Sequence, residues 1–306
     1  MDRTDLLIVG AGPAGLTAAI YGGRAGLSTR VLEAMSPGGW AARTDRIENY
    51  PGVGAVQGAD LAARMLEQAQ SFGAALLPDE ATTVVPLADG FETRCGDAVY
   101  AARALILAVG TGYRKLGVPG EEELTGRGVS YCATCDGPLF RDLEIAVVGG
   151  GDSALQEALY LTRFAGRVHL VHRRDEFRAA RVLADRVRSH PKITCHCRHT
   201  VARVVGGDAV ESVVLRDTDG GRERSLPVAG VFFFVGLEPK TAFLGDLVKR
   251  DAGGFIVTDD DMRTSRRGVL AAGDCRVKTL RQVSTAVGDG ATAAFVAQKY
   301  LEDGEW

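Results

Sequence analysis

Apolar runs of strand length that end in glycine and then give way to apolar residues at helical spacing recur along this chain. Asp5–Val9 leads into the glycine-rich segment 10–15, after which small and apolar residues return every three or four positions up to Gly23. The same order recurs with Leu143–Val148, a glycine-rich turn and a helical pattern to Thr162. Strands that alternate with helices of this length predict an α/β fold.

Further segments extend the pattern. Thr29–Leu32 and Arg167–Val171 are predicted strands, and each follows one of the two helices. Near the end of the chain, Arg267–Asp274 predicts a strand that ends in a carboxylate, and Arg281–Leu301 predicts a helix with one apolar face.

Composition and charge narrow the class of protein. At roughly 150 residues per domain, 306 residues suggest about two domains. The chain has 39 glycines among 306 residues, about one in eight, which is above the usual share of roughly 7%. This excess favours tight turns and close approach of the backbone to ligands. With 36 Lys+Arg against 39 Asp+Glu, the net charge of −3 provides no basic field for nucleic acid or an anionic membrane.

Location follows from the apolar runs and the N-terminal segment. The strongest apolar runs, 104–110 and 231–236, have strand length and fall short of the roughly 18 residues that predict a membrane helix. Residues 1–5 are acidic and lead directly into a strand, unlike a signal peptide. We therefore expect a cytoplasmic protein with reduced cysteines and no membrane partner.

The first glycine-rich turn, G-x-G-x-x-G, has the spacing of a dinucleotide-binding loop. Gly10 permits the tight turn, Gly12 lets the backbone approach a pyrophosphate, and Gly15 lets the helix pack closely on the strand. Glu33 ends the next strand, where a carboxylate can accept both hydroxyls of an adenosine ribose. The alternative is a glycine-rich turn in an unrelated α/β protein. The residues predicted to hold an adenine dinucleotide here are Gly10, Gly12, Pro13, Ala14, Gly15 and Glu33.

The second turn differs from the first at its diagnostic position. Residues 149–154 read G-x-G-x-x-A, and the strand that follows ends in basic residues instead of a carboxylate. Guanidinium groups suit a ribose 2′-phosphate, so we predict NADPH rather than NADH. A solvated basic strand end is the alternative. The predicted NADPH-binding residues are Gly151, Asp152, Ser153, His172, Arg173, Arg174 and Arg178.

Two dinucleotide loops in one chain suggest a bound flavin that a nicotinamide reduces. Asp274 could hold a ribityl hydroxyl, and the amides near Gln282 and Val283, at a predicted helix N-terminus, could stabilise the anion of the reduced flavin. An ordinary core strand and helix is the alternative interpretation.

Cys132 and Cys135 form a Cys-x-x-Cys pair between the two glycine-rich turns. A zinc half-site would need further ligands, and the other local cluster, residues 195–199, does not complete a finger spacing. Two inert buried thiols are a second interpretation, which the flanking Asp136 and Gly137 disfavour. The third is a redox disulfide with Asp136 as the proton donor and acceptor for a departing sulfur. We favour the redox pair, predict no metal site, and interpret Cys195 and Cys197 as structural.

Taken together, these strings resemble the low-molecular-weight thioredoxin reductases, a class of pyridine nucleotide-disulfide oxidoreductases. The most specific are C-A-T-C-D at 132–136 and H-R-R-D-E-F-R-A at 172–179. I-E-N-Y-P-G at 47–52, P-G-E at 119–121 and A-A-G-D at 271–274 with Arg281-Gln282 add to the resemblance, which spans nearly the whole chain.

The resemblance implies a homodimer with two Rossmann-like domains, in which an NADPH domain that carries the cysteines is inserted into an FAD domain. We place the FAD domain at 1–115 and 241–306 and the NADPH domain at 116–240, with rotation between them. Cys135 would face the flavin, Cys132 would attack the disulfide of thioredoxin or a similar small redox protein, and Asp136 would act as acid and base. The remaining FAD contacts implied are Gly39, Trp40, Asn49, Gly110 and Arg281.

The chain departs from the family pattern at several positions. Trp40 stands where the family usually has Gln, Gln156 replaces a usual Glu, and residues 276–280 replace a segment that commonly carries Asp and Tyr. Other functions that fit the sequence are a reductase of a peroxiredoxin or glutaredoxin-like protein, a flavin-dependent dithiol oxidase, and a non-enzymatic cofactor-binding sensor.

Overall fold

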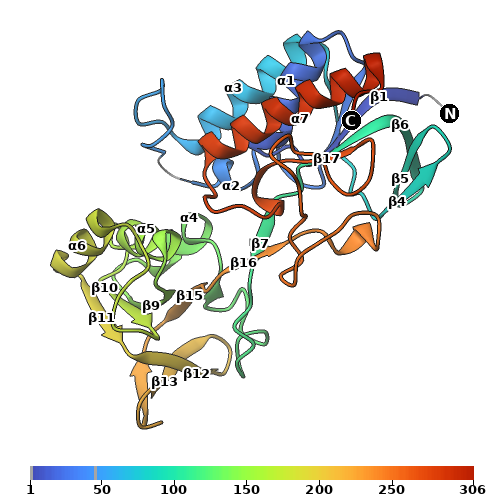
Figure 1. Cartoon of the computed structure of the whole chain (residues 1–306). Helices are drawn as coiled ribbons and strands as arrows, with labels where there is room; N and C mark the ends of the chain where they lie inside the picture. The colour runs from blue at the N-terminus through green and yellow to red at the C-terminus, as the bar shows by residue number, and fades with distance from the viewer. Residues whose placement is uncertain (1–2, 45–46) are drawn as a thin grey trace. The chain divides into compact units, whose positions relative to one another are not determined.

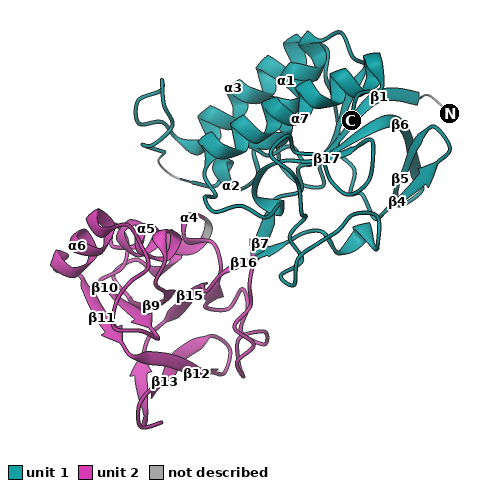
Figure 2. Ribbon diagram, in the orientation of Figure 1, with its two compact units in different colours: residues 1–112, 238–306 teal, residues 113–237 magenta. Residues whose placement is uncertain are grey.

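The computed structural model describes residues 3–44 and 47–306, apart from the side chain of Cys135. The chain divides into two compact units, shown in Figure 2. Unit 1 consists of residues 1–112 and 238–306, and unit 2 is the continuous segment 113–237. The sequence had placed the domain joins at 115/116 and 240/241. Where the chain passes between the units, β7 (Thr111–Tyr113) and β16 (Leu237–Pro239) pair as a two-stranded sheet.

Unit 1 is built around a mixed sheet in the order β3-β2-β1-β6-β5-β4. Strands β3, β2, β1 and β6 run parallel to one another. Strand β5 is antiparallel to both of its neighbours, β6 and β4. Strand β17 pairs in parallel with the last residues of β6. The bounds are β1 Arg3–Val9, β2 Thr29–Leu32, β3 Ala75–Leu77, β4 Thr83–Leu87, β5 Gly90–Cys95, β6 Ala98–Leu107 and β17 Val269–Ala271.

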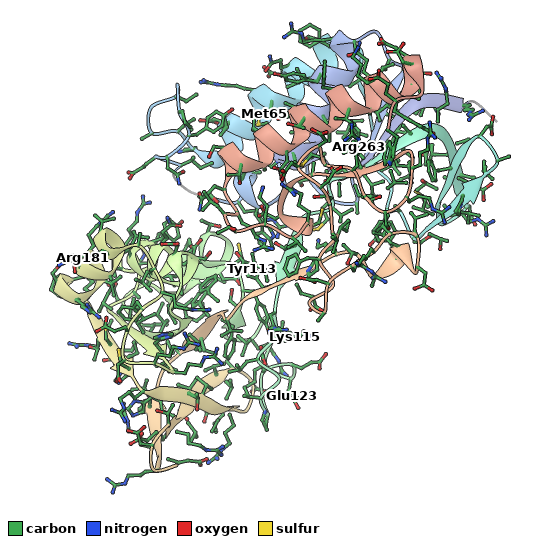
Figure 3. The ribbon with its side chains drawn as sticks, viewed as in Figure 1. Met65, Tyr113, Lys115, Glu123, Arg181 and Arg263 are labelled. Carbon is green, nitrogen blue, oxygen red and sulfur yellow. The ribbon has the colours of Figure 1, made fainter. Side chains whose placement is uncertain are left out.

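Helices α1, α3 and α7 lie side by side in unit 1 (Figure 1). Leu6, Ile8 and Ile106 point into the core with them, whereas the alternate residues of β1 and β6 belong to a second cluster with β4, β5 and segment 244–256. Met65 of α3 is labelled in Figure 3 and belongs to the first cluster. The bounds are α1 Pro13–Arg24, α2 Gly39–Ala42, α3 Gly58–Ser71, η2 Ala242–Leu244, η3 Gly273–Cys275 and α7 Val283–Asp303.

Unit 2 contains a parallel sheet in the order β11-β10-β9-β15-β8. One core cluster packs between this sheet and α5 and α6, and another packs between the sheet and the antiparallel sheet β12-β13-β14. The bounds are β8 Val129–Ser130, α4 Ala133–Asp136, η1 Gly137–Phe140, β9 Glu144–Gly149, α5 Asp152–Leu161, β10 Arg167–His172, α6 Arg181–Ser189, β11 Ile193–Cys197, β12 His199–Gly206, β13 Val210–Asp217, β14 Glu223–Pro227 and β15 Gly230–Phe234. Across the described residues, no helix has the length and apolar character needed to span a bilayer.

Candidate dinucleotide and disulfide sites

The first glycine-rich loop joins β1 to α1, and its glycines stand in different surroundings. Gly10 has a φ of +103°, and a Cβ there would lie 2.4 Å from the carbonyl oxygen of Ala108. A Cβ on Gly15 would lie 1.8 Å from the carbonyl oxygen of Gly10. Gly12, by contrast, has nothing within 4 Å of its Cβ position. The loop is therefore packed tightly against the sheet while Gly12 faces open space, as approach of a pyrophosphate requires.

Glu33 lies directly after β2 and contacts the same loop. Its Oε2 accepts the backbone N–H of Ala11 at 2.8 Å, and its Oε1 accepts that of Met35 at 3.0 Å. Gly110, which follows β6, has a φ of +61° and nothing within 4 Å of its Cβ position. The carboxylate predicted to receive the ribose is thus held beside the loop.

Asp274 lies in η3, directly after β17, and carries an orphaned acceptor. Its Oδ1 is buried without a hydrogen-bond partner. Burial raises the pKa of Asp274, while Lys278 and Arg281 act in the opposite direction. A buried carboxylate oxygen with no donor has the chemistry to accept a hydroxyl of a bound group, so this residue fits the FAD ribityl chain.

The start of α7 is tied to several of the other predicted FAD residues. Gln282 is the N-cap of α7 and shares a capping box with Thr285, and its Oε1 accepts Asn49 Nδ2–H at 2.9 Å. Arg281 donates to the carbonyls of Asp274 and Arg276, and its guanidinium lies 4.3 Å from the centre of the Phe255 ring. The amides at Val283 therefore open a helix whose N-terminus is held in place.

Trp40 lies in α2, directly after Gly39. Its indole N–H donates to the carbonyl of Thr111 at 2.6 Å. Gly39 has a φ of +55°, and its Cβ position lies 3.4 Å from Cα of Gly12. Trp40 therefore links α2 to the end of the first segment of unit 1, and this bond accounts for its indole N–H.

The second loop, between β9 and α5, repeats the arrangement of the first. Gly149 has a φ of +153°, and a Cβ there would lie 2.5 Å from the carbonyl oxygen of Phe234, whereas Gly151 has nothing within 4 Å. Asp152 Oδ1 accepts the N–H of Ala180 at 2.8 Å, so the segment after β10 is fastened to the start of α5. Ser153, the second residue of α5, is exposed at this end of the helix.

The predicted NADPH residues at the end of β10 and directly after it are of two kinds. His172 is buried, its Nε2–H donates to the carbonyl of Glu176 at 3.1 Å, and burial lowers its pKa. A Cβ on Gly150 would lie 2.2 Å from the His172 ring, so this imidazole packs directly against the loop at Gly150. The other predicted residues, by contrast, are exposed: Arg173, Arg174 and Arg178.

Cys132 follows β8 and is part of a disulfide. Ser130 is buried, and its hydroxyl accepts the N–H of Cys132 at 3.0 Å and donates to Asp136 Oδ2 at 2.6 Å. The backbone of Cys135 lies in α4, and its side chain lies outside the described part of the structure. Ser130 therefore orients Asp136 and the backbone of Cys132 together, a role that the sequence analysis missed.

A second missed group involves Tyr131, the residue directly before Cys132. Glu121 is 2% exposed, and its carboxylate accepts the Tyr131 hydroxyl at 2.7 Å. It also accepts the backbone N–H groups of residues 116–118. Burial and this hydrogen bond raise the pKa of Tyr131. The signal was present in the string P-G-E, but the partner of Glu121 could not be read from it.

The remaining cysteines, Cys95, Cys195, Cys197 and Cys275, are free thiols. Burial raises the pKa of each, to about 11 for Cys95 and about 12 for Cys275. No group of three or more His, Cys, Asp or Glu side chains suited to a metal ion occurs within the described residues.

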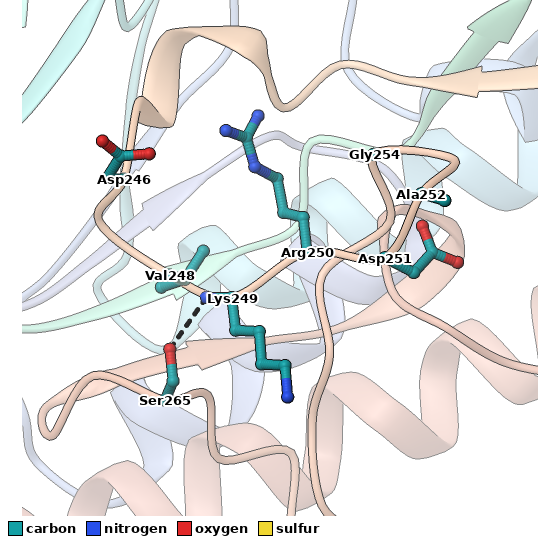
Figure 4. Close-up of a pocket in the computed structure, with 8 residues that line it drawn as sticks. All are labelled: Asp246, Val248, Lys249, Arg250, Asp251, Ala252, Gly254 and Ser265. Atoms are coloured by element: carbon teal, nitrogen blue, oxygen red, sulfur yellow. Dashed lines mark hydrogen bonds between the residues drawn. The ribbon is translucent and has the colours of Figure 1, made fainter.

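Two surface hollows lie in unit 1, apart from every predicted site residue. One, of about 640 Å³, is lined by segment 246–254 and Ser265, and the N–H of Lys249 donates to Ser265 Oγ at 2.8 Å (Figure 4). The other, of about 760 Å³, is lined partly by Arg3, Arg103 and Arg267, which are engaged by Asp89, Asp5 and the carbonyl of Gly304 respectively.

A family model for the pyridine nucleotide-disulphide oxidoreductases matches residues 4–290, so the chain belongs to that family.

Its relatives within the family are thioredoxin reductases. That of Listeria innocua is 48% identical over 300 residues, which cover 98% of this chain and 94% of the relative. That of Treponema pallidum is 47% identical over 299 residues, which cover 97% of each chain. The crystal structure of Lactococcus lactis thioredoxin reductase matches with a TM-score of 0.96 and 42% identity, and covers 97% of this chain and 99% of that one.

These findings confirm the predicted resemblance, the α/β fold with two Rossmann-like domains, and the class of reaction. Thioredoxin reductases are NADPH-dependent, FAD-containing disulfide reductases, and this chain is an oxidoreductase of that type.

Proposed function

We propose that this chain transfers electrons from NADPH through FAD to a Cys132–Cys135 disulfide and from there to the disulfide of thioredoxin. The observation that carries the proposal is the pairing of two similar loops with different neighbours. Gly12 and Gly151 both face open space, but a carboxylate adjoins the first loop and exposed arginines follow the second. The only Cys-x-x-Cys sequence lies in unit 2, beside the second loop in sequence.

In unit 1, the loop at 10–15 and Glu33 bind the adenosine half of FAD, and Asp274 accepts a ribityl hydroxyl. The other residues that would hold the cofactor are Gly39, Trp40, Asn49, Gly110, Arg281, Gln282 and Val283. When bound, FAD supplies two-electron chemistry between NADPH and the disulfide.

In unit 2, Gly151 and the N-terminus of α5, with Asp152 and Ser153, face the pyrophosphate of NADPH. Arg173, Arg174 and Arg178 bind the 2′-phosphate, because their exposed guanidinium groups provide bidentate donors. His172 does not bind the phosphate in this proposal; its buried imidazole packs against Gly150 and holds the turn of the loop.

The thiol steps follow from the reduced pair. The Cys132 thiolate attacks one sulfur of the substrate disulfide, which forms a mixed disulfide and releases the other substrate sulfur as a thiolate. Asp136, which has taken up the proton of the Cys132 thiol, gives that proton to the departing sulfur. The Cys135 thiol then passes its own proton to Asp136 and attacks Cys132 Sγ, which re-forms the internal disulfide. The second substrate sulfur leaves and takes this proton from Asp136. Ser130 holds Asp136 in place for this proton transfer.

Replacement of Cys135 with Ser tests the order of transfer. We expect NADPH to reduce the bound flavin as in the parent protein, because unit 1 and the NADPH loop are unchanged. Reduction of thioredoxin should fall to the background rate, because no internal disulfide can form. Flavin absorbance under anaerobic NADPH and coupled NADPH oxidation with thioredoxin measure the two steps. Loss of both steps, or retention of both, would contradict the proposed order.

Thioredoxin is favoured as the substrate over other redox proteins because the relatives, which match over nearly their full length, are named thioredoxin reductases. A peroxiredoxin or glutaredoxin-like protein in the same assay is the comparison substrate, and faster NADPH oxidation with it would overturn the assignment. A dithiol oxidase would instead consume oxygen in the presence of a dithiol.

We further propose a cytoplasmic homodimer. The four free thiols suit a reducing compartment, and the dimer rests on the family resemblance. Light scattering that gives the mass of a single 306-residue chain would contradict the dimer.

A further inference from the structure

Asp289 is a buried carboxylate on the apolar-rich helix α7, and three donors converge on it. Its Oδ2 accepts the backbone N–H of Gly273 at 2.9 Å, Arg276 Nε–H at 2.9 Å and Lys278 Nζ–H at 2.6 Å. The side chains of Arg276 and Lys278 are only 14% and 8% exposed. We call the side chains of Asp289, Arg276 and Lys278 the Asp289 cluster.

The cluster fastens one particular loop. Gly273, Arg276 and Lys278 all lie between β17 and α7, in the segment that also carries Asp274 and Arg281. Arg276 makes a further bond from its guanidinium to Thr258 Oγ1 at 2.7 Å. The segment has little regular structure beyond the short η3, so side-chain bonds such as these hold much of its shape.

The position of the bonds relative to Asp274 is the decisive point. The Gly273 N–H that Asp289 accepts belongs to the residue directly before Asp274. Gly273 has a φ of +79°, a left-handed conformation, and its Cβ position lies 2.9 Å from the Ala14 side chain. Asp289 therefore fixes the turn that aims the orphaned Asp274 Oδ1.

Charge supports the same reading. Burial raises the pKa of Asp274, Lys278 and then Arg281 oppose this rise, and the Asp289 carboxylate adds a smaller rise of its own. Lys278 stays near Asp274 because Asp289 binds its ammonium group. The Lys278 ammonium that Asp289 holds, together with Arg281, favours the ionised, accepting form of Asp274.

We propose that Asp289 is a positioning residue for the cofactor. Through Gly273, Arg276 and Lys278 it holds the Asp274 loop in its binding shape before FAD arrives. This inference rests on the proposed role of Asp274 in FAD binding. It also gives a function to the divergent segment 276–280, since Arg276 and Lys278 are its two cations.

The test is a double-mutant cycle on FAD affinity. Apoprotein is titrated with FAD, and binding is followed by flavin fluorescence, for the parent, Asp289→Asn, Asp274→Asn and the double variant. We expect Asp289→Asn to weaken FAD binding about tenfold or more, because the buried negative charge that pairs with Arg276 and Lys278 is lost. In the Asp274→Asn background the same change should have little further effect, because Asp289 acts through Asp274.

The matched control is Asp303→Asn, which removes an exposed carboxylate from the same helix, where it faces Lys299. It should bind FAD like the parent. Thermal unfolding of each apoprotein reports any general loss of stability, and Lys278→Met offers a second variant that leaves Asp289 bonded to Gly273. If Asp289→Asn fails to fold, Lys278→Met should still weaken FAD binding.

The inference is overturned if Asp289→Asn and Lys278→Met bind FAD as tightly as the parent, or if the losses from Asp289 and Asp274 simply add. A parent protein that does not bind FAD would instead contradict the proposed function. The two failures are therefore distinguishable in one set of titrations.

Discussion

Ser130, Glu121 and Asp289 are buried polar residues, and each holds a neighbour that carries chemistry. Ser130 bonds Asp136, Glu121 bonds Tyr131 beside Cys132, and Asp289 bonds the turn before Asp274. Buried polar groups of this kind are costly unless each is satisfied, and here each one is. At the residue scale, the site consists of reactive groups together with the buried partners that aim them.

Replacement of Ser130 with Ala tests this for the cysteine site. Asp136 loses a donor and the Cys132 N–H loses its acceptor, so we expect thioredoxin reduction to slow about tenfold, from the loss of roughly 1.4 kcal/mol of positioning. NADPH-dependent reduction of the flavin should be unchanged. Stopped-flow flavin reduction and steady-state rates of thioredoxin reduction measure the two steps separately.

Ser189→Ala is the control for this change, because its hydroxyl donates only to helix carbonyls at the exposed end of α6. A Ser130→Ala enzyme that reduces thioredoxin at the parental rate would remove Ser130 from the mechanism.

At the scale of elements, a chain of hydrogen bonds crosses unit 2 from β14 to β9. Arg224 donates to His196 Nδ1 at 2.7 Å, so the His196 Nε2–H faces His169 Nδ1 at 3.0 Å, and His169 Nε2–H faces Glu144 at 2.8 Å. This order of donors requires both imidazoles to be neutral. Burial, with Arg224 next to it, lowers the pKa of His196 to about 4. A proton on His196 would break its bond to Arg224.

These hydrogen bonds through His196 and His169 predict that the folded protein is sensitive to acid. In the unfolded chain His196 takes up a proton near its ordinary pKa of about 6.5, whereas in the folded protein it stays neutral down to about 4. Stability should therefore fall as the pH drops from about 6.5 towards 4. His196→Gln should flatten the dependence of the melting temperature on pH in this window. His190 takes no part in these hydrogen bonds, so His190→Gln should leave the dependence of the melting temperature on pH as in the parent. An unchanged dependence in His196→Gln would contradict the role given to His196.

The sequence predicted the elements that repeat a local pattern and missed those that depend on distant partners. Strand β2 matches its predicted range, and α1 and α7 start within two or three residues of theirs, because apolar spacing and caps are local signals. The sheet β12-β13-β14 was not predicted, since its strands are set by pairing with each other and by packing on β9 and β15. The glycine loops could be predicted because their function lies in the backbone. Ser130 and Asp289 could not, because folding alone brings them to their partners.

At the scale of the whole molecule, the chain carries two loops of one design in two separate units. Each has a crowded first glycine and an open third position. The difference lies after the next strand, where Glu33 adjoins one loop and exposed arginines adjoin the other. Binding of the two nucleotides should therefore respond to different substitutions.

Replacement of Arg173 and Arg174 together with Ala tests this division. We expect the KM for NADPH to rise about tenfold or more, because charge-assisted bonds to the 2′-phosphate are lost. The KM for NADH and the FAD content should stay close to parental values, so the preference for NADPH falls. Arg181→Ala, whose side chain is 96% exposed on α6 (Figure 3), is the control. An unchanged preference between NADPH and NADH would place the 2′-phosphate elsewhere.

The discontinuity of unit 1 has a consequence for how this protein is made. Strand β17 and helix α7, which complete the first sheet and its helical layer, are synthesised last, after the whole of unit 2. During translation the continuous segment 113–237 can fold as soon as it leaves the ribosome. The sheet formed by residues 1–112 stays incomplete until segment 238–306 has been made. Until then, the edge of β6 that pairs with β17 is exposed. A nascent chain of which residues up to about 240 have left the ribosome should therefore present a folded unit 2 joined to an unfinished, chaperone-accessible unit 1.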